Sequence, residues 1–318
     1  MSLTEARATG LPKWLRQLYP FRTRTLRIGP YAMSFVDQGP ATAPPILLLH
    51  GNSTWSFLYR GLIRRLRKQY RVVAPDMIGF GLSDQPEPPA YHTLDQHVTN
   101  LVRLLEALEL RQVTLVMHGW GGPIGLGYAV SFPQNTARLV LSNSWGGHLP
   151  RLPRSVPWGM RVTGRGSLGR WADSLLNLSL GSAFSASMCR GRIAGRVRAA
   201  YLYPFRRAGS PVAVFAFNRM FSDPDRVTTT NLATIQAGLK NLEAPADILC
   251  GAEDPVLSKL PAYLLRDGLK NAREPIFLSD IAHYLPEEDP QALAAVILRG
   301  IGQKSEPSPG GNFFRILS

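Results

Sequence analysis

Hydrophobic and polar positions follow two rhythms that alternate along the chain. Short continuous apolar runs, which are typical of strands buried on both faces, occur at residues 45–49, 70–75, 112–117, 137–141, 246–251 and 274–279. Runs with helical spacing of apolar residues, which predict helices packed on a core, occur at residues 55–69, 93–110, 121–131, 261–269 and 291–302. Strands and helices that alternate in this way favour a mostly parallel sheet with helices on both faces.

Two segments depart from this rhythm. Residues 11–39 predict an amphipathic turn, which we expect to pack on its own domain, and then a hairpin that turns at Gly29-Pro30. Residues 147–214 are rich in glycine, proline and arginine and hold only short helical runs, around 171–180 and 193–203. We therefore predict one core domain (residues 1–146 and 215–318) with an inserted helical cap (147–214) and a loose tail from residue 304.

The stretch from Val113 to Ala129 is the element around which the other candidate residues are arranged. A β-branched apolar run meets a glycine pair and then a helix-like run, which predicts a strand, a sharp turn and a helix. In a nucleophile elbow, a small-x-nucleophile-x-small-small pattern holds the nucleophile at positive φ in such a turn. Residues 117–122 fit the pattern, and the position of the nucleophile is Gly119.

Other reactive side chains follow other predicted strands. His50-Gly51-Asn52 comes after the first buried strand, Asp254 after a late one and His283 after the last. Open parallel sheets bind ligands at the carboxyl ends of their strands, so these side chains are expected near one cleft under the cap. The chain order of nucleophile position, acid and histidine is that of α/β-hydrolases and differs from other triad enzymes. The predicted fold is therefore the α/β-hydrolase fold.

Three motifs carry a closer resemblance. Residues 50–60 (HGNSTWSFLYR), 72–84 (VVAPDMIGFGLSD) and 120–123 (WGGP) resemble the haloalkane dehalogenases. The N-terminal WLRQLYPF segment and the cap look most like the branch that contains the β-lactone decarboxylases of bacterial long-chain olefin synthesis. The resemblance covers roughly residues 24–146 and 245–303.

The resemblance implies roles for the site residues. In that family an aspartate at the position of Gly119 attacks carbon, and a histidine then activates water. His283 would be this general base and Asp254 the carboxylate that orients it. The side chains of Asn52 and Trp120 would hold the leaving halide or carboxylate, and their backbone N–H groups would form the oxyanion hole. The family implies an apolar substrate and needs no metal or organic cofactor.

Several residues compete for these roles. Glu253 neighbours Asp254, and some relatives place the acid one strand earlier, where Asn143 cannot serve. His118 is a substitute nucleophile only if its side chain turns toward the cleft, and we expect it to point elsewhere. His50 is expected to shape its loop, and Asp76 and Asp84 to be structural. Tyr201 and Tyr203 could mimic the paired tyrosines of epoxide hydrolases, although their apolar run favours packing.

Charge and composition bear on localisation and partners. The net charge is +14, and residues 1–36 and 147–210 carry most of the excess. Such segments predict either contact with an anionic membrane surface or an acidic protein partner, or only a basic proteome and a solvated arginine-rich face. Nucleic acid is unlikely because no binding motif accompanies them. Two cysteines, no signal peptide and no apolar run near the ~20 residues of a membrane span predict a cytoplasmic protein, with peripheral membrane contact as an alternative.

The absence of a nucleophile at residue 119 leaves two hypotheses for the function. The first is a haloalkane dehalogenase-like or β-lactone decarboxylase-like hydrolase whose covalent step is lost, by natural change or by deliberate substitution. Its His283–Asp254 pair could still drive attack by water on a strained lactone, far less on an alkyl halide. The second is a non-catalytic binding or scaffold subunit that docks through its basic segments. Ser53, in place of the proline usual after His-Gly-Asn, is a smaller departure.

Overall fold

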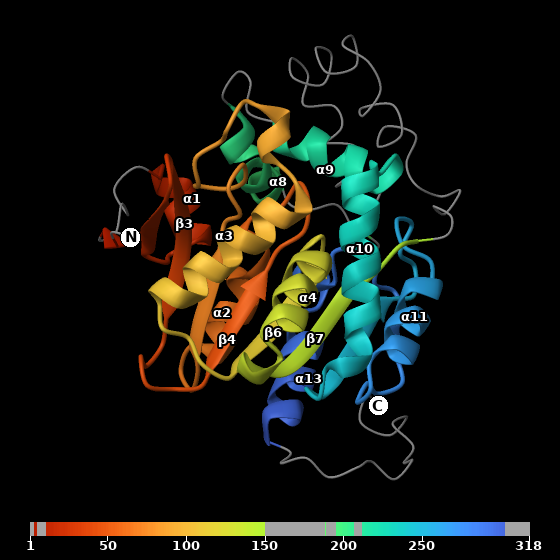
Figure 1. The fold of residues 1–318 in the computed structure, drawn as a ribbon. Coiled ribbons are helices and arrows are strands. Elements are labelled where there is room, and N and C mark those ends of the chain that lie inside the picture. Colours follow the sequence, from red (N-terminus) through yellow and green to blue (C-terminus); the bar gives the residue numbers. More distant parts are fainter. Residues whose placement is uncertain (1–2, 5–10, 150–187, 189–194, 207–211, 303–318) are drawn as a thin grey trace.

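A single mixed β-sheet forms the centre of the protein (Figure 1). The computed structural model describes residues 3–4, 11–149, 188, 195–206 and 212–302. Within these residues, nine strands lie in the order β1-β2-β3-β5-β4-β6-β7-β8-β9. The pairs from β5 to β9 are parallel, whereas β1, β2 and β3 extend the sheet in antiparallel fashion. The strands are β1 (Leu3–Thr4), β2 (Thr23–Ile28), β3 (Tyr31–Gln38), β4 (Pro45–Leu49), β5 (Arg71–Pro75), β6 (Val113–Gly119), β7 (Thr136–Ser144), β8 (Ala246–Gly251) and β9 (Ile276–Leu278).

Helices cover both faces of the sheet, as the alternating pattern predicts. In the described residues the α-helices are α1 (Lys13–Leu18), α2 (Arg60–Leu66), α3 (Leu94–Ala107), α4 (Gly121–Ser131), α8 (Gly195–Leu202), α9 (Val212–Ser222), α10 (Arg226–Gly238), α11 (Leu260–Gly268), α12 (Leu285–Glu288) and α13 (Pro290–Gly302). Short 3-10 helices are η1 (Ser56–Tyr59), η2 (Pro89–Tyr91), η3 (Pro133–Asn135), η4 (Tyr203–Arg206) and η5 (Leu239–Asn241). No helix of the described ranges is long and apolar enough to cross a membrane.

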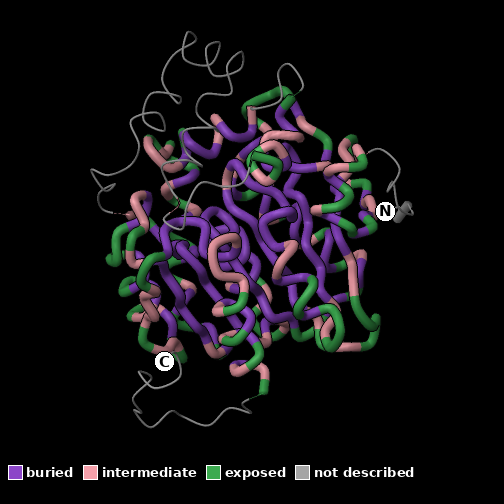
Figure 2. Tube along the Cα trace, turned by 180° about the vertical axis from the view of Figure 1, so that it is seen from behind, coloured by how far each residue is buried: buried purple, intermediate pink, exposed green. Residues whose placement is uncertain are grey.

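The sheet divides the interior into two hydrophobic cores. Side chains alternate between the faces of a strand, so Leu47 and Leu49 of β4 join one core and Ile46 and Leu48 the other. Helices α3, α4, α10 and α11 pack on the first core, and α1, α2, α8, α12 and α13 pack on the second. Figure 1 shows α3, α4 and α10 in front of the sheet and α13 behind it. The buried trace in Figure 2 follows the strands, whereas the exposed residues lie at the periphery.

The predicted fold is confirmed, with differences in detail. Strand β4 and helix α4 have the predicted bounds, whereas the run at 55–69 divides into η1 and α2. Helices α9, α10 and α12 were not predicted. Helix α9 crosses from residue 214 to 215, where we expected the core to resume, so the division into core and cap stays a prediction. The helical run at 171–180 and the tail at 304–318 lie outside the described residues.

Candidate active site

Strand β6 ends in the predicted turn at Gly119. The φ angle of Gly119 is 52°, in the left-handed region that side chains with a Cβ rarely adopt. A Cβ placed there would lie 3.3 Å from the Cα of Gly51 and would meet no other described atom within 4 Å. The backbone therefore has the conformation of a nucleophile elbow, and the space for the missing side chain is largely open.

The two glycines that begin α4 are required by close packing and not by a left-handed backbone. A Cβ on Gly121 would lie 2.2 Å from the carbonyl oxygen of Leu49, and one on Gly122 would lie 1.8 Å from Oγ of Ser144. Both contacts are far closer than van der Waals distance, so α4 can approach β4 and β7 only because these residues lack side chains. This close packing fixes the elbow between two strands.

Asp254 and His283 meet across the loops that follow β8 and β9. Nδ1 of His283 donates a hydrogen bond to Oδ2 of Asp254 at 2.9 Å, and the Asp254 side chain is only 3% exposed. Oδ1 of Asp254 accepts backbone N–H bonds from Val256 and Leu257, at 2.7 and 3.0 Å. Glu253, the competing carboxylate, is exposed. The geometry therefore pairs His283 with Asp254.

Electrostatics keep Asp254 ionised. Burial by itself raises the pKa of this carboxyl, but the charge and hydrogen bond of His283, with bonds from Asn143 and Leu257, together lower the pKa below its usual value. An ionised Asp254 holds the proton of His283 on Nδ1. In the neutral tautomer that this bond selects, the other ring nitrogen, Nε2, carries the lone pair that can accept a proton from water.

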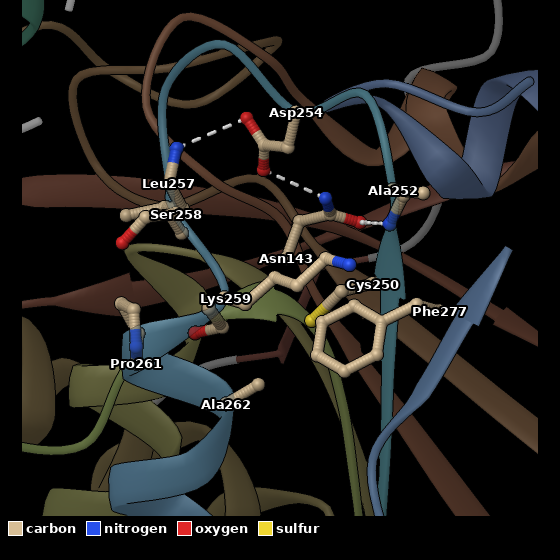
Figure 3. A pocket seen from close by; sticks show the side chains of 12 residues that line it. Asn143, Cys250, Ala252, Asp254, Leu257, Ser258, Lys259, Pro261, Ala262 and Phe277 are labelled. Carbon is tan, nitrogen blue, oxygen red and sulfur yellow. Dashed lines mark hydrogen bonds between the residues drawn. The ribbon is translucent and has the colours of Figure 1, made fainter. Parts of the chain in front are cut away.

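Asn143 contributes to the site in a way that the sequence did not reveal. Its Nδ2 donates to Oδ2 of Asp254 at 2.7 Å and to the carbonyl of Ala282 at 3.2 Å. Asn143 lies at the end of β7 with a φ angle of 45°, which turns the side chain toward the next strand. Figure 3 shows this bond beside a cavity of about 110 Å³ that Cys250 and Phe277 also line. Gly119, Asn52, Trp120 and His283 do not line this cavity, so it is separate from the open position at Gly119.

His118, the neighbour of Gly119, is a buried structural residue. Its Nε2 donates to the backbone carbonyl of His283 at 2.9 Å, and the two imidazole rings lie 4.9 Å apart. Burial, aided by the nearby His283, lowers the pKa of His118 to about 3, so the ring is neutral. Nδ1 carries the free lone pair but is buried, as is the whole side chain at 1% exposed, so the substitute-nucleophile role has no support. The contact instead holds His283 beside the elbow.

Asn52 follows strand β4, and helix α9 holds its side chain. Its Nδ2 donates to Oδ1 of Asn218 at 2.7 Å and to the carbonyl of Val214 at 3.3 Å, both on α9. Its Oδ1 accepts from the backbone N–H of Ser53 at 2.8 Å, which fixes the orientation of the amide. Both amide N–H groups are therefore engaged, and a leaving group has to compete with α9 for them.

Trp120 lies in an aromatic cluster next to the elbow. Its ring is 5.1 Å from the rings of both Trp145 and Phe217, and Phe217 also contacts Phe80. In the described part of the chain, neither the indole N–H of Trp120 nor the backbone N–H groups of Asn52 and Trp120 have a hydrogen-bond acceptor. These donors sit beside an apolar wall formed in part by α9.

The remaining polar candidates have structural partners. Nε2 of His50 accepts the backbone N–H of Met77 at 2.9 Å while Nδ1 donates to the carbonyl of Gly51, and burial lowers the pKa of His50 to about 4. Asp76 accepts the backbone N–H groups of Ser56 and Leu82, and burial raises its pKa to about 6. Asp84 accepts the backbone N–H of Ala32.

The two cap tyrosines do not form a pair that faces the elbow. Tyr201 is fully buried in the core on the α2 side of the sheet, and its hydroxyl donates to Glu287. The ring of Tyr203 packs against Trp14 of α1, with 6.3 Å between ring centroids. This arrangement gives no support to the epoxide hydrolase alternative.

The fold and the elbow define the class of protein. The profile of the alpha/beta hydrolase fold family matches residues 44–290, and the chain belongs to that family. A cis-3-alkyl-4-alkyloxetan-2-one decarboxylase from Xanthomonas campestris pv. campestris is 32% identical over 289 residues, which cover 88% of this chain and 95% of the relative. A haloalkane dehalogenase from Mycolicibacterium paratuberculosis is 34% identical over 288 residues, which cover 88% and 92%. The resemblance to these two groups is thus confirmed.

Solved structures agree on the fold. The haloalkane dehalogenase DbeA from Bradyrhizobium elkani superposes with a TM-score of 0.80 at 22% identity, covering 88% of this chain and 97% of that one. An ancestral haloalkane dehalogenase gives a TM-score of 0.78 at 24% identity. At these identities the matches show the fold alone, and that fold is the one that the family match gives.

Proposed function

We propose that the protein is an α/β-hydrolase of the dehalogenase and β-lactone decarboxylase type that opens a strained lactone by direct attack of water. The observation that carries the proposal is the buried Asp254–His283 pair beside an elbow whose nucleophile position, Gly119, is open. Without a carboxylate at residue 119 no alkyl-enzyme ester can form. The pair can still act as a general base on a water molecule.

The proposed reaction balances without a cofactor. Water gives a proton to Nε2 of His283 as its oxygen bonds to the lactone carbonyl carbon, and Asp254 stabilises the imidazolium that forms. The backbone N–H groups of Asn52 and Trp120, which have no acceptor among the described residues, would stabilise the developing oxyanion. The ring C–O bond then breaks, and the alkoxide takes the proton from His283. Lactone and water together give a β-hydroxy acid.

The surroundings of the elbow favour an apolar lactone. Phe80, Trp145 and Phe217 form an aromatic wall next to Trp120, which suits alkyl chains better than polar substituents. A strained ester is activated toward water, whereas an alkyl halide needs a stronger nucleophile and a free halide site. Asn52 has both amide N–H groups engaged with α9. For this reason we place a cis-3,4-dialkyl β-lactone before a haloalkane as the substrate.

The test compares three proteins on a long-chain cis-3,4-dialkyl β-lactone in H₂¹⁸O. The wild type is expected to release β-hydroxy acid with ¹⁸O in its carboxylate, and His283→Ala is expected to release none above the uncatalysed rate. Gly119→Asp is expected to form a covalent adduct visible by mass spectrometry and to turn over on the order of 10³-fold faster or more, as the loss of a nucleophile usually implies.

Two outcomes contradict the proposal in different ways. If the wild type is no faster than His283→Ala while Gly119→Asp forms an adduct, the site is a dehalogenase-type site that the glycine has silenced. If Gly119→Asp also gives neither product nor adduct with the lactone or with haloalkanes, the chain is the non-catalytic binding or scaffold subunit. Whether or not the protein is catalytic, we propose that it is cytoplasmic and contacts an anionic membrane surface through basic residues.

A further inference from the structure

The N-terminal third of the described chain has an unusual excess of positive charge. Residues 11–75 contain eleven lysines and arginines and one acid, Asp37. Asp37 pairs with Arg24 and Arg71 at 2.9 Å, and Glu287 pairs with Arg60. These pairs leave most of the basic residues of the segment without an acidic partner in the described part of the protein.

Seven of these residues form what we call the α1–α2 face. All seven are exposed, and the structure records no ion pair for any of them within the described ranges. The α1–α2 face consists of Lys13, Arg16, Arg22, Arg64, Arg65, Arg67 and Lys68.

Two contacts show that these residues belong to one surface. Nη2 of Arg64 on α2 donates to the carbonyl of Leu18 at the end of α1, at 2.9 Å. The guanidinium of Arg67 lies over the ring of Phe21, 5.8 Å from its centroid. Helix α2 is therefore in contact with the segment that carries Lys13, Arg16 and Arg22.

The like charges act on one another. Burial lowers the pKa of Arg64, and the nearby charges of Arg60 and Arg67 lower it further. Mutual repulsion of this kind destabilises a compact fold, and a polyanionic surface relieves it. An arrangement of seven positive charges without an acid thus fits a partner with many negative charges.

We propose that the α1–α2 face docks the protein on an anionic lipid surface. Trp14 and Leu18 are only partly buried between the basic residues of α1, and Trp14 packs on Tyr203 of η4. Basic residues around a partly exposed tryptophan and leucine are typical of segments that lie at a membrane interface. A site for single-stranded nucleic acid would need exposed aromatic side chains on which bases stack, and the seven exposed residues of this face include none.

The experiment measures binding of the full-length protein to vesicles without substrate, so its outcome is independent of the proposed hydrolysis. Vesicles of phosphatidylcholine with 30% phosphatidylglycerol are compared with pure phosphatidylcholine in a sedimentation assay. The face variant carries Lys13→Gln, Arg16→Gln, Arg22→Gln and Lys68→Gln, four exposed positions whose side chains have no hydrogen bond recorded in the described structure. The control variant, with the same net charge, carries Arg103→Gln, Arg111→Gln, Arg226→Gln and Lys240→Gln, exposed positions on or beside helices of the opposite sheet face.

The expected result is binding to anionic vesicles only. Each basic residue near such a surface strengthens binding about fivefold, so the face variant should bind at least about 100-fold more weakly, with a much smaller loss in the control. Raising the salt from about 0.1 to 1 M shortens the Debye length from about 10 to 3 Å and should release the protein.

Three results would overturn the assignment. They are the absence of binding to anionic vesicles, equal losses in the face and control variants, and a preference for single-stranded RNA or polyglutamate over vesicles at the same salt. The melting temperatures of both variants, compared with wild type, show whether either has lost its fold.

Discussion

Introducing a Cβ at Gly119 isolates the backbone strain of the elbow from its chemistry. In Gly119→Ala the backbone stays at a φ angle of 52°, where a side chain costs about 1–3 kcal/mol. The substitution also restricts the unfolded chain, which offsets about 0.4–1 kcal/mol. The nearest atom, Cα of Gly51 at 3.3 Å, demands only a small shift. The net loss of stability is therefore about 1–2 kcal/mol.

That loss translates into a small change in the melting temperature. A chain of 318 residues has an unfolding entropy of about 0.7 kcal/mol/K near its midpoint, so the melting temperature should fall by about 2–3 °C. Differential scanning calorimetry of wild type and variant at the same pH measures it. Gly119→Asp should show a similar decrease while it gains the nucleophile.

Gly121→Ala provides the matched comparison. Gly121 has no positive φ angle, but its Cβ would lie 2.2 Å from the carbonyl oxygen of Leu49 and 3.0 Å from that of His50. Backbone neighbours cannot move aside, so this variant should lose at least about 3 kcal/mol. If Gly119→Ala loses as much as Gly121→Ala, the space at residue 119 is not open. An unchanged or higher melting temperature for Gly119→Ala would show that the strained position is elsewhere.

Three further predictions concern neighbours of the elbow. Burial lowers the pKa of His118 to about 3, so only the unfolded chain binds a proton at this residue as the pH falls below about 6.5. The free energy of unfolding should therefore drop by about 1.4 kcal/mol per pH unit. Urea unfolding of His118→Gln should show a flatter pH dependence. Asn143→Leu removes a hydrogen bond to the carboxylate of Asp254, worth about 1.5–3 kcal/mol, so the pKa of Asp254 should rise by about one unit or more. When the change is made in the Gly119→Asp background, the acidic limb of the pH–rate profile should move to higher pH by the same amount. An unmoved limb would contradict the role of Asn143. Asn218→Ala frees Nδ2 of Asn52 and should lower the Kd for bromide several-fold in a tryptophan fluorescence titration, whereas a weaker affinity would show that α9 helps to form the halide site.

Much of the fold could be predicted from the sequence because buried strands and helices have characteristic local patterns of apolar residues and glycines. The run of Pro45–Leu49 is apolar throughout since β4 is covered on both faces, and the glycines of α4 mark its close approach to β4 and β7. Helix α10 also has a sequence signal, with Asp225 as its N-cap and apolar residues such as Leu232 and Ile235 at helical spacing, but no helix was predicted between residue 215 and the strand at 246.

Parts of the site had no local signal. Asn52 and Asn218 are 166 positions apart, and nothing in either neighbourhood indicates that their side chains meet. The bond between Asn143 and Asp254 spans 111 positions and depends on the left-handed backbone of Asn143. Such contacts depend on how β7, β8 and α9 are placed in space, and sequence spacing does not encode that placement.

The open position at Gly119 has an evolutionary consequence. Codons for glycine and aspartate can differ at a single base, so a single mutation can convert one residue into the other at the elbow. The glycine retains the left-handed turn, and the hydrogen bonds of His283 and Asp254 do not involve residue 119. Loss and recovery of the nucleophile are therefore single steps on an otherwise unchanged scaffold, and lineages related to this protein could pass between the two states repeatedly.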